Sequence, residues 1–410
     1  MTGDPAARAV RAVDPPMVVV AGHLCLDLIP RLLMGPAAGP RRGRRPARPE
    51  ALESLGPITL AVGGCVGNTG LALHRLGLRS RLVARVGDDR LGGVLSGLVR
   101  EAVPGDAARL VVAAGAPTSY SLVWNRPGRD REIQHFPGVN DTFVAADVPD
   151  EVLAGGSLLH VGYPPLMAAM VADDGAELRR LLVRARARGL ATSLDMANAN
   201  LDPDQGPVRW RRLLEQVLPE VDVFLPSLAE ASRLLRRRVE RDERGAPALA
   251  SVARLADELI RLGVGIAGVK LGEHGLYVRT ASVARLATGL GNLPGAWADR
   301  ELYSSVFEAD VVGTTGAGDA TIAGFLFGLL TGMPPSAAVT AACAVGGSST
   351  EAADGTSAIP DWPAIERRLR QGWRRTAAAP GPGWSPSHAP GLWDGPRDPR
   401  PETDRRPGIG

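Results

Sequence analysis

Cysteine is scarce in this sequence, as are aromatic side chains and lysine. The 410 residues include three cysteines, Cys25, Cys65 and Cys343, which lie far apart and form no Cys-x-x-Cys pair. This spacing indicates neither a disulfide framework nor a zinc site, and it is typical of proteins in a reducing compartment. The sequence has no continuous apolar segment before Pro15, and no apolar run is long enough to span a bilayer. We therefore expect a cytoplasmic protein with no membrane contact.

Aromatic residues make up 4% of the chain, so a core must be built mostly from Ala, Val and Leu. The hydrophobic fraction of 45% is nevertheless sufficient for a large core. A net charge of +3 argues against a dedicated nucleic-acid-binding protein, and we expect no such partner. Lys270 is the single lysine among 47 basic residues. Either it survives by chance, or its position needs a compact, flexible ammonium group.

Composition divides the chain into three parts. Residues 1–15 are rich in Ala, Arg, Asp and Pro without periodicity, which predicts a disordered arm. Residues 16–370 carry the periodic apolar patterns of a folded α/β domain. Residues 371–410 are rich in Pro, Gly and Arg, which predicts a disordered tail.

Short apolar strands alternate with amphipathic helices in the second half of the domain. We predict strands over 158–161, 191–194, 221–225 and 266–270, with helices over 178–188 and 252–262. This alternation favours a parallel sheet that is covered by helices on both faces. The alternating residues of 118–136 instead predict a β-hairpin, with its turn at 127–128.

A glycine-rich segment late in the chain carries the strongest chemical signal. Residues 313–319 read Gly-Thr-Thr-Gly-Ala-Gly-Asp and precede a helix predicted over 321–330. The glycines allow a tight turn that brings backbone N–H groups together at the positive end of the helix, which makes an anion hole. The presence of a carboxylate, Asp319, next to an anion hole is explained if it accepts a proton from an attacking hydroxyl while the hole binds the transferring phosphoryl group. Alternatively, the glycines merely make a turn and Asp319 caps the helix.

A second glycine-rich segment lies near the N-terminus. Residues 63–68 read Gly-Gly-Cys-Val-Gly-Asn and precede a helix predicted over 69–76. The glycines again allow a ligand close to the backbone, and the Asn68 amide offers the donor and acceptor that suit a sugar hydroxyl. Asp27 follows the first predicted strand by a few residues, and its carboxylate suits two adjacent hydroxyl groups.

Together the two segments resemble the signatures of the ribokinase-like, or pfkB-type, carbohydrate kinase family. The first signature extends from Gly63 to Gly92 and the second from Thr314 to Phe325, and the shorter motifs between them follow the family's order. The resemblance covers residues 17 to 362. It implies a ribokinase-like α/β fold, which is a three-layer sandwich with a mostly parallel central sheet and a small β-lid.

The resemblance also implies roles for individual residues. Asp319 would be the catalytic base, and the backbone amides of Gly316, Ala317 and Gly318 would form the anion hole. The acceptor would be held by Asp27, Gly63, Gly64, Asn68 and Asn140.

The nucleotide is expected beside the strand 266–270 and the segment 341–356, with ATP and Mg²⁺ as the implied cofactors. The implied nucleotide-binding residues are Lys270, Gly272, Gly275 and Thr315. The family usually carries Asn-x-x-Glu near the metal, and here the matching run begins at Ser227 and ends at Glu230. Glu230 would act on Mg²⁺ through water.

A lid is implied for residues of about 28–34, 57–62 and 118–136. It would exclude water so that the acceptor, rather than water, is phosphorylated. In several members of the family this lid also forms a homodimer interface, and we expect the same possibility here.

The sequence therefore predicts an ATP-dependent kinase that phosphorylates a hydroxyl group of a sugar or sugar-like molecule. One alternative is a nucleoside kinase of the adenosine-kinase type, for which Tyr120, Trp124 and Phe136 would supply a shelf for the base. An alternative of another class is a catalytically weak, sugar-binding sensor. The complete motif around Asp319 argues against the sensor.

Overall fold

The computed structural model describes residues 15–33, 54–103, 105–125, 132–197, 208–243, 245–291, 293, 295–376 and 380–399. The predicted arm lies outside this set except for Pro15. Residues 34 and 126–131 of the predicted lid, and 377–379 and 400–410 of the predicted tail, also lie outside it.

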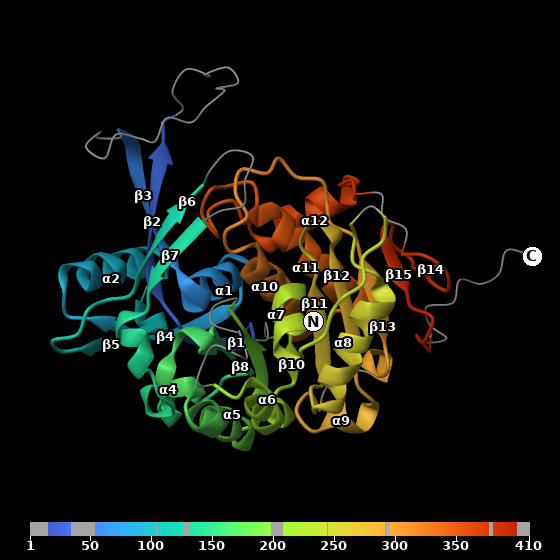
Figure 1. The fold of residues 1–410 in the computed structure, drawn as a ribbon, viewed down its shortest axis with the longest axis horizontal. Helices are drawn as coiled ribbons and strands as arrows, with labels where there is room; N and C mark the ends of the chain where they lie inside the picture. The colour runs from blue at the N-terminus through green and yellow to red at the C-terminus, as the bar shows by residue number, and fades with distance from the viewer. Residues whose placement is uncertain are drawn as a thin grey trace, which may run out of the picture.

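An eleven-stranded sheet forms the centre of the molecule (Figure 1). Its strands, in spatial order, are β14 (Ser385–Pro386), β15 (Leu392–Asp394), β13 (Glu301–Ser304), β12 (Leu276–Thr280), β11 (Ile266–Lys270), β10 (Val223–Phe224), β9 (Ala191–Asp195), β8 (Leu158–Gly162), β1 (Met17–Gly22), β4 (Arg79–Gly87) and β5 (Ala108–Ala113). The strands from β11 to β5 in this order are parallel, whereas β12, β13, β15 and β14 are antiparallel to their neighbours. This confirms the predicted mostly parallel sheet.

Strand β1 shows why the core has two halves. Its whole length is buried, and successive side chains point to opposite faces of the sheet. Val18 and Val20 belong to one apolar cluster, and Val19 and Ala21 belong to the other. A continuous apolar run of this kind is typical of a central parallel strand with helices on both sides.

Two helical layers cover the sheet. The helices whose buried side chains join the first cluster are α1 (Gly64–Arg75), α2 (Arg90–Ala102), α9 (Val283–Ala287), α10 (Ala317–Leu330), α11 (Pro335–Ser349) and α12 (Trp362–Arg370). The helices that join the second are α3 (Asp150–Leu153), α4 (Ala168–Val171), α5 (Ala176–Ala187), α6 (Trp210–Val217), α7 (Leu228–Leu234) and α8 (Leu249–Arg261). The three-layer sandwich expected from the sequence is confirmed.

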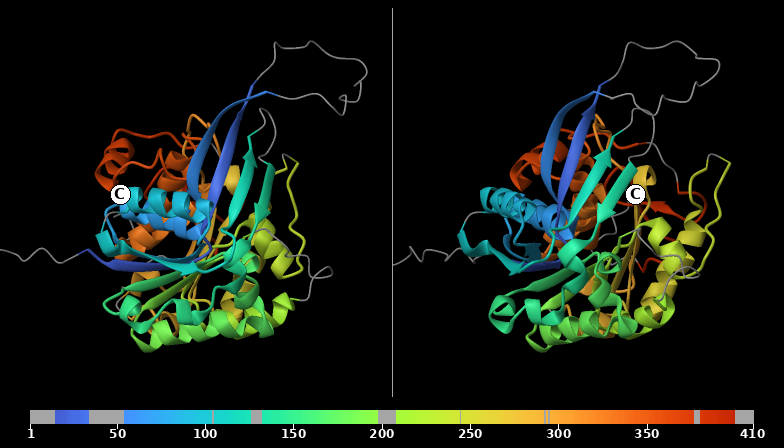
Figure 2. Two further views of the ribbon diagram at one scale, coloured as in Figure 1. Left: turned by 90° about the vertical axis from the view of Figure 1, so that its left-hand side faces the viewer. Right: turned by 60° about the vertical axis from the view of Figure 1, so that its left-hand side comes forward.

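A second, four-stranded sheet projects from the body (Figure 2). Its order is β3 (Leu55–Gly63), β2 (Cys25–Leu32), β6 (Tyr120–Trp124) and β7 (Glu132–Phe136). The three segments predicted for the lid therefore come together in one sheet. The pairing of Cys25 with Gly63 brings the base of this sheet to the first glycine-rich segment.

The described part of the C-terminal segment differs from the predicted disordered tail. Strand β15 pairs with β13 and adds an edge to the large sheet. Trp393 stacks on Tyr303 with ring centroids 5.5 Å apart, and the buried Arg300 donates from Nε to Asp398 Oδ2 over 2.9 Å. Composition alone does not predict these contacts, because the partners of the segment lie far away in the sequence, on and beside β13. Among the described helices, none is both long and apolar enough to cross a bilayer.

Candidate active site

The polar side chains of the site follow the carboxyl ends of parallel strands. His23 comes directly after β1, Tyr163 after β8, and Asp195 and Lys270 end β9 and β11. Open α/β sheets bind ligands at this edge because the loops there converge on one crevice. The fold thus places four side chains together that are far apart in sequence.

Both glycine-rich segments form the first turns of helices. Helix α1 begins at Gly64 and α10 at Ala317, several residues before the helices predicted over 69–76 and 321–330. Gly316 caps α10 with φ 71°, a left-handed conformation that favours glycine. A Cβ atom at Gly316 would lie 2.6 Å from the Gly355 Cα atom, so the turn also needs glycine for space.

Asp319 lies in the first turn of α10 and is buried. Three side chains donate hydrogen bonds to its carboxylate: Tyr163 Oη to Oδ2 over 2.6 Å, Asn68 Nδ2 to Oδ2 over 3.1 Å, and Thr69 Oγ1 to Oδ1 over 3.2 Å. Burial and the nearby Asp195 charge raise the pKa of Asp319 to about 7, although the Tyr163 hydrogen bond and Lys270 oppose the rise. A carboxylate with this pKa suits general-base catalysis near neutral pH.

Lys270 connects the start of α10 to a group of buried carboxylates. Its ammonium donates to Asp195 Oδ1 over 3.0 Å, and it lies so close to Gly318 that a Cβ atom there would be 3.3 Å from Nζ. Burial disfavours the charged amine, but Asp195, Glu230 and Asp319 together raise the pKa of Lys270. The single lysine of the chain therefore stays charged beside the helix N-terminus, where anions bind.

Glu230 and Ser227 form a reciprocal cap at the start of α7. The Ser227 backbone N–H donates to Glu230 Oε2 over 2.6 Å, and the Glu230 N–H donates to Ser227 Oγ over 3.2 Å. Burial raises the pKa of Glu230, with Lys270 opposing and Asp195 adding to the rise. The Ser-x-x-Glu spacing is the sequence pattern of a capping box. Sequence reasoning missed this cap and related the two residues only to the metal region.

The predicted acceptor residues lie on the other side of Asp319. A Cβ atom at Gly63 would fall 2.3 Å from the Asp27 carboxylate, so the glycine makes room for this side chain. Asp27 is nearly buried and accepts a hydrogen bond from Cys25 Sγ over 3.3 Å. Gly64 has φ 79° and turns the chain beside His23, where a Cβ atom would meet the imidazole at 2.6 Å.

Asn140 is buried, and both ends of its amide contact the backbone of Leu24. Nδ2 donates to the Leu24 carbonyl over 2.9 Å, and Oδ1 accepts from the Leu24 N–H over 3.4 Å. In this conformation Asn140 fixes the connection between β1 and β2, on which Asp27 depends. These contacts support a positioning role for Asn140, and its predicted contact with an acceptor stays a prediction.

The remaining predicted nucleotide residues lie at two turns. Gly272 and Gly275 have φ values of 61° and 97° in the turn between β11 and β12, and a Cβ atom at Gly275 would clash with the Ser304 carbonyl at 1.9 Å. Thr315 Oγ1 is buried and has no hydrogen-bond partner within the described residues. A buried hydroxyl of this kind is available to a phosphate oxygen or another polar ligand.

These geometric features agree with the comparison of the whole chain with known proteins. Residues 38–362 match the family described as pfkB family carbohydrate kinase. The chain belongs to the pfkB carbohydrate kinase family. This pfkB kinase is 26% identical over 324 residues to 2-dehydro-3-deoxygluconokinase of Bacillus subtilis, with 75% of this chain and 86% of the relative covered. It is 27% identical over 265 residues to a sugar kinase of Archaeoglobus fulgidus, with coverage of 64% and 87%.

The fold of the pfkB kinase is similar to that of solved ribokinases. The structure of Arabidopsis thaliana ribokinase complexed with ribose and ATP superposes with a TM-score of 0.62 and 19% sequence identity, covering 87% of this chain and 99% of that one. Its family membership makes the protein a phosphotransferase of the carbohydrate kinase class, with a hydroxyl group as acceptor. Asp27 and His23 precede the residues that match the family, so their assignment depends on the geometry given above.

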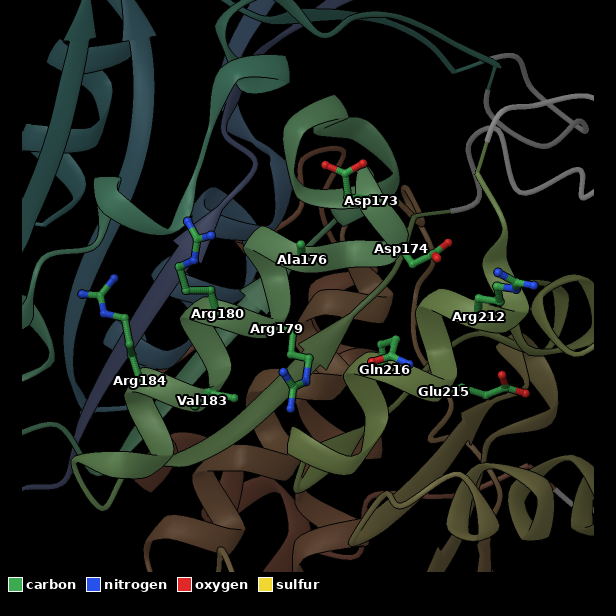
Figure 3. Close-up of a pocket in the computed structure, with 10 residues that line it drawn as sticks. All are labelled: Asp173, Asp174, Ala176, Arg179, Arg180, Val183, Arg184, Arg212, Glu215 and Gln216. Carbon is green, nitrogen blue, oxygen red and sulfur yellow. The ribbon is translucent and has the colours of Figure 1, made fainter.

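A separate hollow of about 740 Å³ lies between α5 and α6 of the pfkB kinase (Figure 3). Its lining includes Arg179, Arg180, Arg184 and Arg212 but none of the residues around Asp319. Three of these arginines already pair with carboxylates of the same surface. The hollow therefore belongs to the outer helical layer and not to the catalytic cluster.

Proposed function

We propose that this pfkB kinase transfers the γ-phosphoryl group of ATP to a hydroxyl group of a sugar or sugar-like acceptor, with Asp319 as the base. The observation that carries the proposal is the position of the buried Asp319 carboxylate. It lies in the first turn of α10, between the Lys270 ammonium on one side and Asn68 on the other.

The acceptor side orients the base. Tyr163, Asn68 and Thr69 hold the Asp319 carboxylate in one conformation, so a lone pair is directed at an acceptor hydroxyl before the reaction begins. The hydroxyl oxygen attacks phosphorus as its proton passes to Asp319, and ADP leaves. Asp27 supplies a second carboxylate, which can accept hydrogen bonds from other hydroxyl groups of the acceptor.

The phosphate side supplies positive potential. The amides of Gly316, Ala317 and Gly318 surround the N-terminus of α10, and the Lys270 ammonium adjoins Gly318. The orphaned Thr315 hydroxyl supports a phosphate contact at the same turn. Glu230 and Asp195 are carboxylates of the kind that hold Mg²⁺ through water, and the ion would neutralise phosphate charge when bound.

A nucleoside kinase is the second candidate, and one observation favours it. Tyr120 and Phe136 pair across β6 and β7 with ring centroids 5.6 Å apart, which gives the lid an aromatic surface. Such a surface suits stacking against a nucleobase. Sugars also bind aromatic surfaces, so the acceptor panel below separates the two candidates.

A homodimer through the lid is part of the proposal. Leu55, Ile58 and Leu60 on β3 expose 47%, 53% and 40% of their surface. Exposed apolar side chains on an edge strand favour association with a second chain. Size measurement by light scattering, for the wild type and for Ile58→Glu, tests this, and a wild-type monomer at micromolar concentration would contradict it.

A panel of acceptors tests the function directly. Purified protein with ATP and Mg²⁺ is assayed for ADP release and for a phosphorylated product on pentoses, hexoses, ketoses, sugar acids and nucleosides. We expect transfer to members of one sugar class. Transfer to nucleosides alone would establish the second candidate, and binding of sugar without transfer across the panel would support the sensor.

A further inference from the structure

Three potential metal ligands meet where the lid joins the body. His23 follows β1, Cys25 begins β2, and His135 belongs to the lid strand β7. One ligand atom from each of these residues lies within 4.8 Å of the other two. His23 and Cys25 are buried, and His135 is half-buried. The sequence does not predict this group of ligands, because His135 is 112 residues from His23.

The two imidazoles face each other through their Nε2 atoms, which are 3.2 Å apart. A tetrahedral zinc ion with nitrogen ligands at roughly 2.0–2.1 Å would hold them roughly 3.3–3.4 Å apart, so a small adjustment suffices. A direct hydrogen bond between the rings gives a similar distance. The Cys25 thiol beside the two rings favours the metal, because a hydrogen bond between two histidines needs no third ligand.

The surroundings favour neutral imidazoles, the form that binds a metal, whereas they keep the thiol protonated until a metal displaces its proton. Ser121 Oγ lies 3.1 Å from His135 Nδ1, and in the tautomer in which Nδ1 carries the hydrogen and donates it to Ser121, Nε2 presents its lone pair to a metal. Burial lowers the pKa of both histidines, and for His23 the neighbouring His135 lowers it further. Both rings are therefore neutral near pH 7. Burial and Asp27 raise the pKa of the Cys25 thiol, but a coordinated metal ion displaces the proton of a thiol.

We propose that His23, Cys25 and His135 bind a divalent ion of the zinc class, which joins lid strand β7 to the body of the protein. Two imidazoles and one thiolate suit Zn²⁺, and they leave the fourth tetrahedral position open. Cys25 now donates its thiol hydrogen to Asp27 Oδ1. On metal binding this proton is released to solvent and Asp27 loses a hydrogen-bond donor.

The site is therefore linked to acceptor binding, a consequence that depends on the proposed role of Asp27. The ion would restrain β7 beside the acceptor pocket and change the hydrogen bonding of the Asp27 carboxylate. We expect Zn²⁺ to raise the KM for the acceptor and to leave the KM for ATP nearly unchanged.

Cobalt(II) spectroscopy on the full-length protein tests the site without any activity assay. After removal of metal by a chelator, we expect Co²⁺ to give a thiolate-to-cobalt absorption band that saturates at a single equivalent and disappears when Zn²⁺ is added. The band is lost in Cys25→Ser and in His135→Gln, and it is kept in Cys343→Ala, in which a distant buried thiol is removed. His135 is only half-buried on an edge strand, so its variant remains informative if Cys25→Ser fails to fold.

Absence of the band from the wild type at saturating Co²⁺ would overturn the proposed site. So would a band that survives in both ligand variants, because other ligands would then be responsible. Acceptor kinetics with and without Zn²⁺ test the link separately, and an unchanged acceptor KM in protein that shows the band would overturn it. If the band is present and no kinase acceptor is found, the metal site stands and the proposed function fails.

Discussion

The two sides of Asp319 hold their polar side chains in different ways. On the phosphate side, Lys270 lies among Asp195, Glu230 and Asp319, and each buried charge has an opposite charge near it. On the acceptor side, the Cys25 thiol donates a hydrogen bond to Asp27, and the paired imidazoles of His23 and His135 lie beside this thiol. The contacts described on the phosphate side are thus mainly between opposite charges, and those described on the acceptor side are hydrogen bonds between uncharged groups and Asp27 or one another. The catalytic carboxylate lies between them and is influenced by both.

This difference separates binding of phosphate from selection of the acceptor. Paired buried charges contribute little net stability, but they leave a strong local field where a phosphate approaches. Uncharged polar groups instead distinguish ligands by the direction of their hydrogen bonds. Variants on the two sides should therefore affect different kinetic constants.

Replacement of the base should have the largest effect. Asp319→Asn keeps the shape of the side chain but removes its capacity to accept a proton. We expect kcat to fall by about 10²–10⁴-fold, which is the usual contribution of a general base. Steady-state kinetics with the acceptor found in the panel measure this, with the unfolding temperature as a control. Full turnover by the variant would show that another group accepts the proton.

Lys270→Ala should affect binding of ATP more than binding of the acceptor, and it should also raise the pKa of Asp319. It leaves Asp195 buried without its partner, and breaking such a pair costs about 3–5 kcal/mol of folding stability. The KM for ATP should rise much more than the KM for the acceptor. Lys270→Arg is the matched control, because it keeps the charge with a different shape. Denaturant unfolding and kinetics in both substrates provide the measurements, and an unchanged KM for ATP would remove Lys270 from the nucleotide site.

The pH dependence of the reaction should report the pKa of Asp319, which groups on both sides of the carboxylate influence. Because Asp319 must be ionised to accept a proton, kcat/KM should rise with pH through a midpoint at about 7. Tyr163→Phe removes a hydrogen bond that lowers the pKa, so the midpoint should move to higher pH. Asp195→Asn removes a charge that raises the pKa, so the midpoint should move to lower pH. Shifts in the same direction for both variants would contradict this account.

Asn140→Ala should have the smallest effect, confined to the acceptor side. The change orphans the buried Leu24 backbone groups, at about 1–3 kcal/mol for an unsatisfied group. The KM for the acceptor should rise several-fold as the segment that carries Asp27 loosens, while the KM for ATP stays the same. Equal changes in both constants would indicate a general loss of structure. The unfolding temperature of the variant separates the two effects.

Sequence reasoning predicted the layered fold, because strand and helix periodicities leave local patterns, and of the three hydrogen-bond donors to Asp319 it singled out Asn68. It did not predict Tyr163, which donates to Asp319 across 156 positions and adopts φ 64° despite its side chain. No local signal marks a contact of that kind. The family resemblance placed Asn140 at the acceptor, whereas its contact with the Leu24 backbone appears only in three dimensions.

The contacts of the last described segment also could not be predicted from local sequence. They matter for the design of a shortened protein. Strand β15 covers the side of β13 that would otherwise present unpaired N–H and C=O groups. A protein cut at residue 370 would expose this edge, and Arg300 would lose the Asp398 carboxylate. Such a fragment would be prone to edge-to-edge aggregation even though every residue of the catalytic cluster is still present.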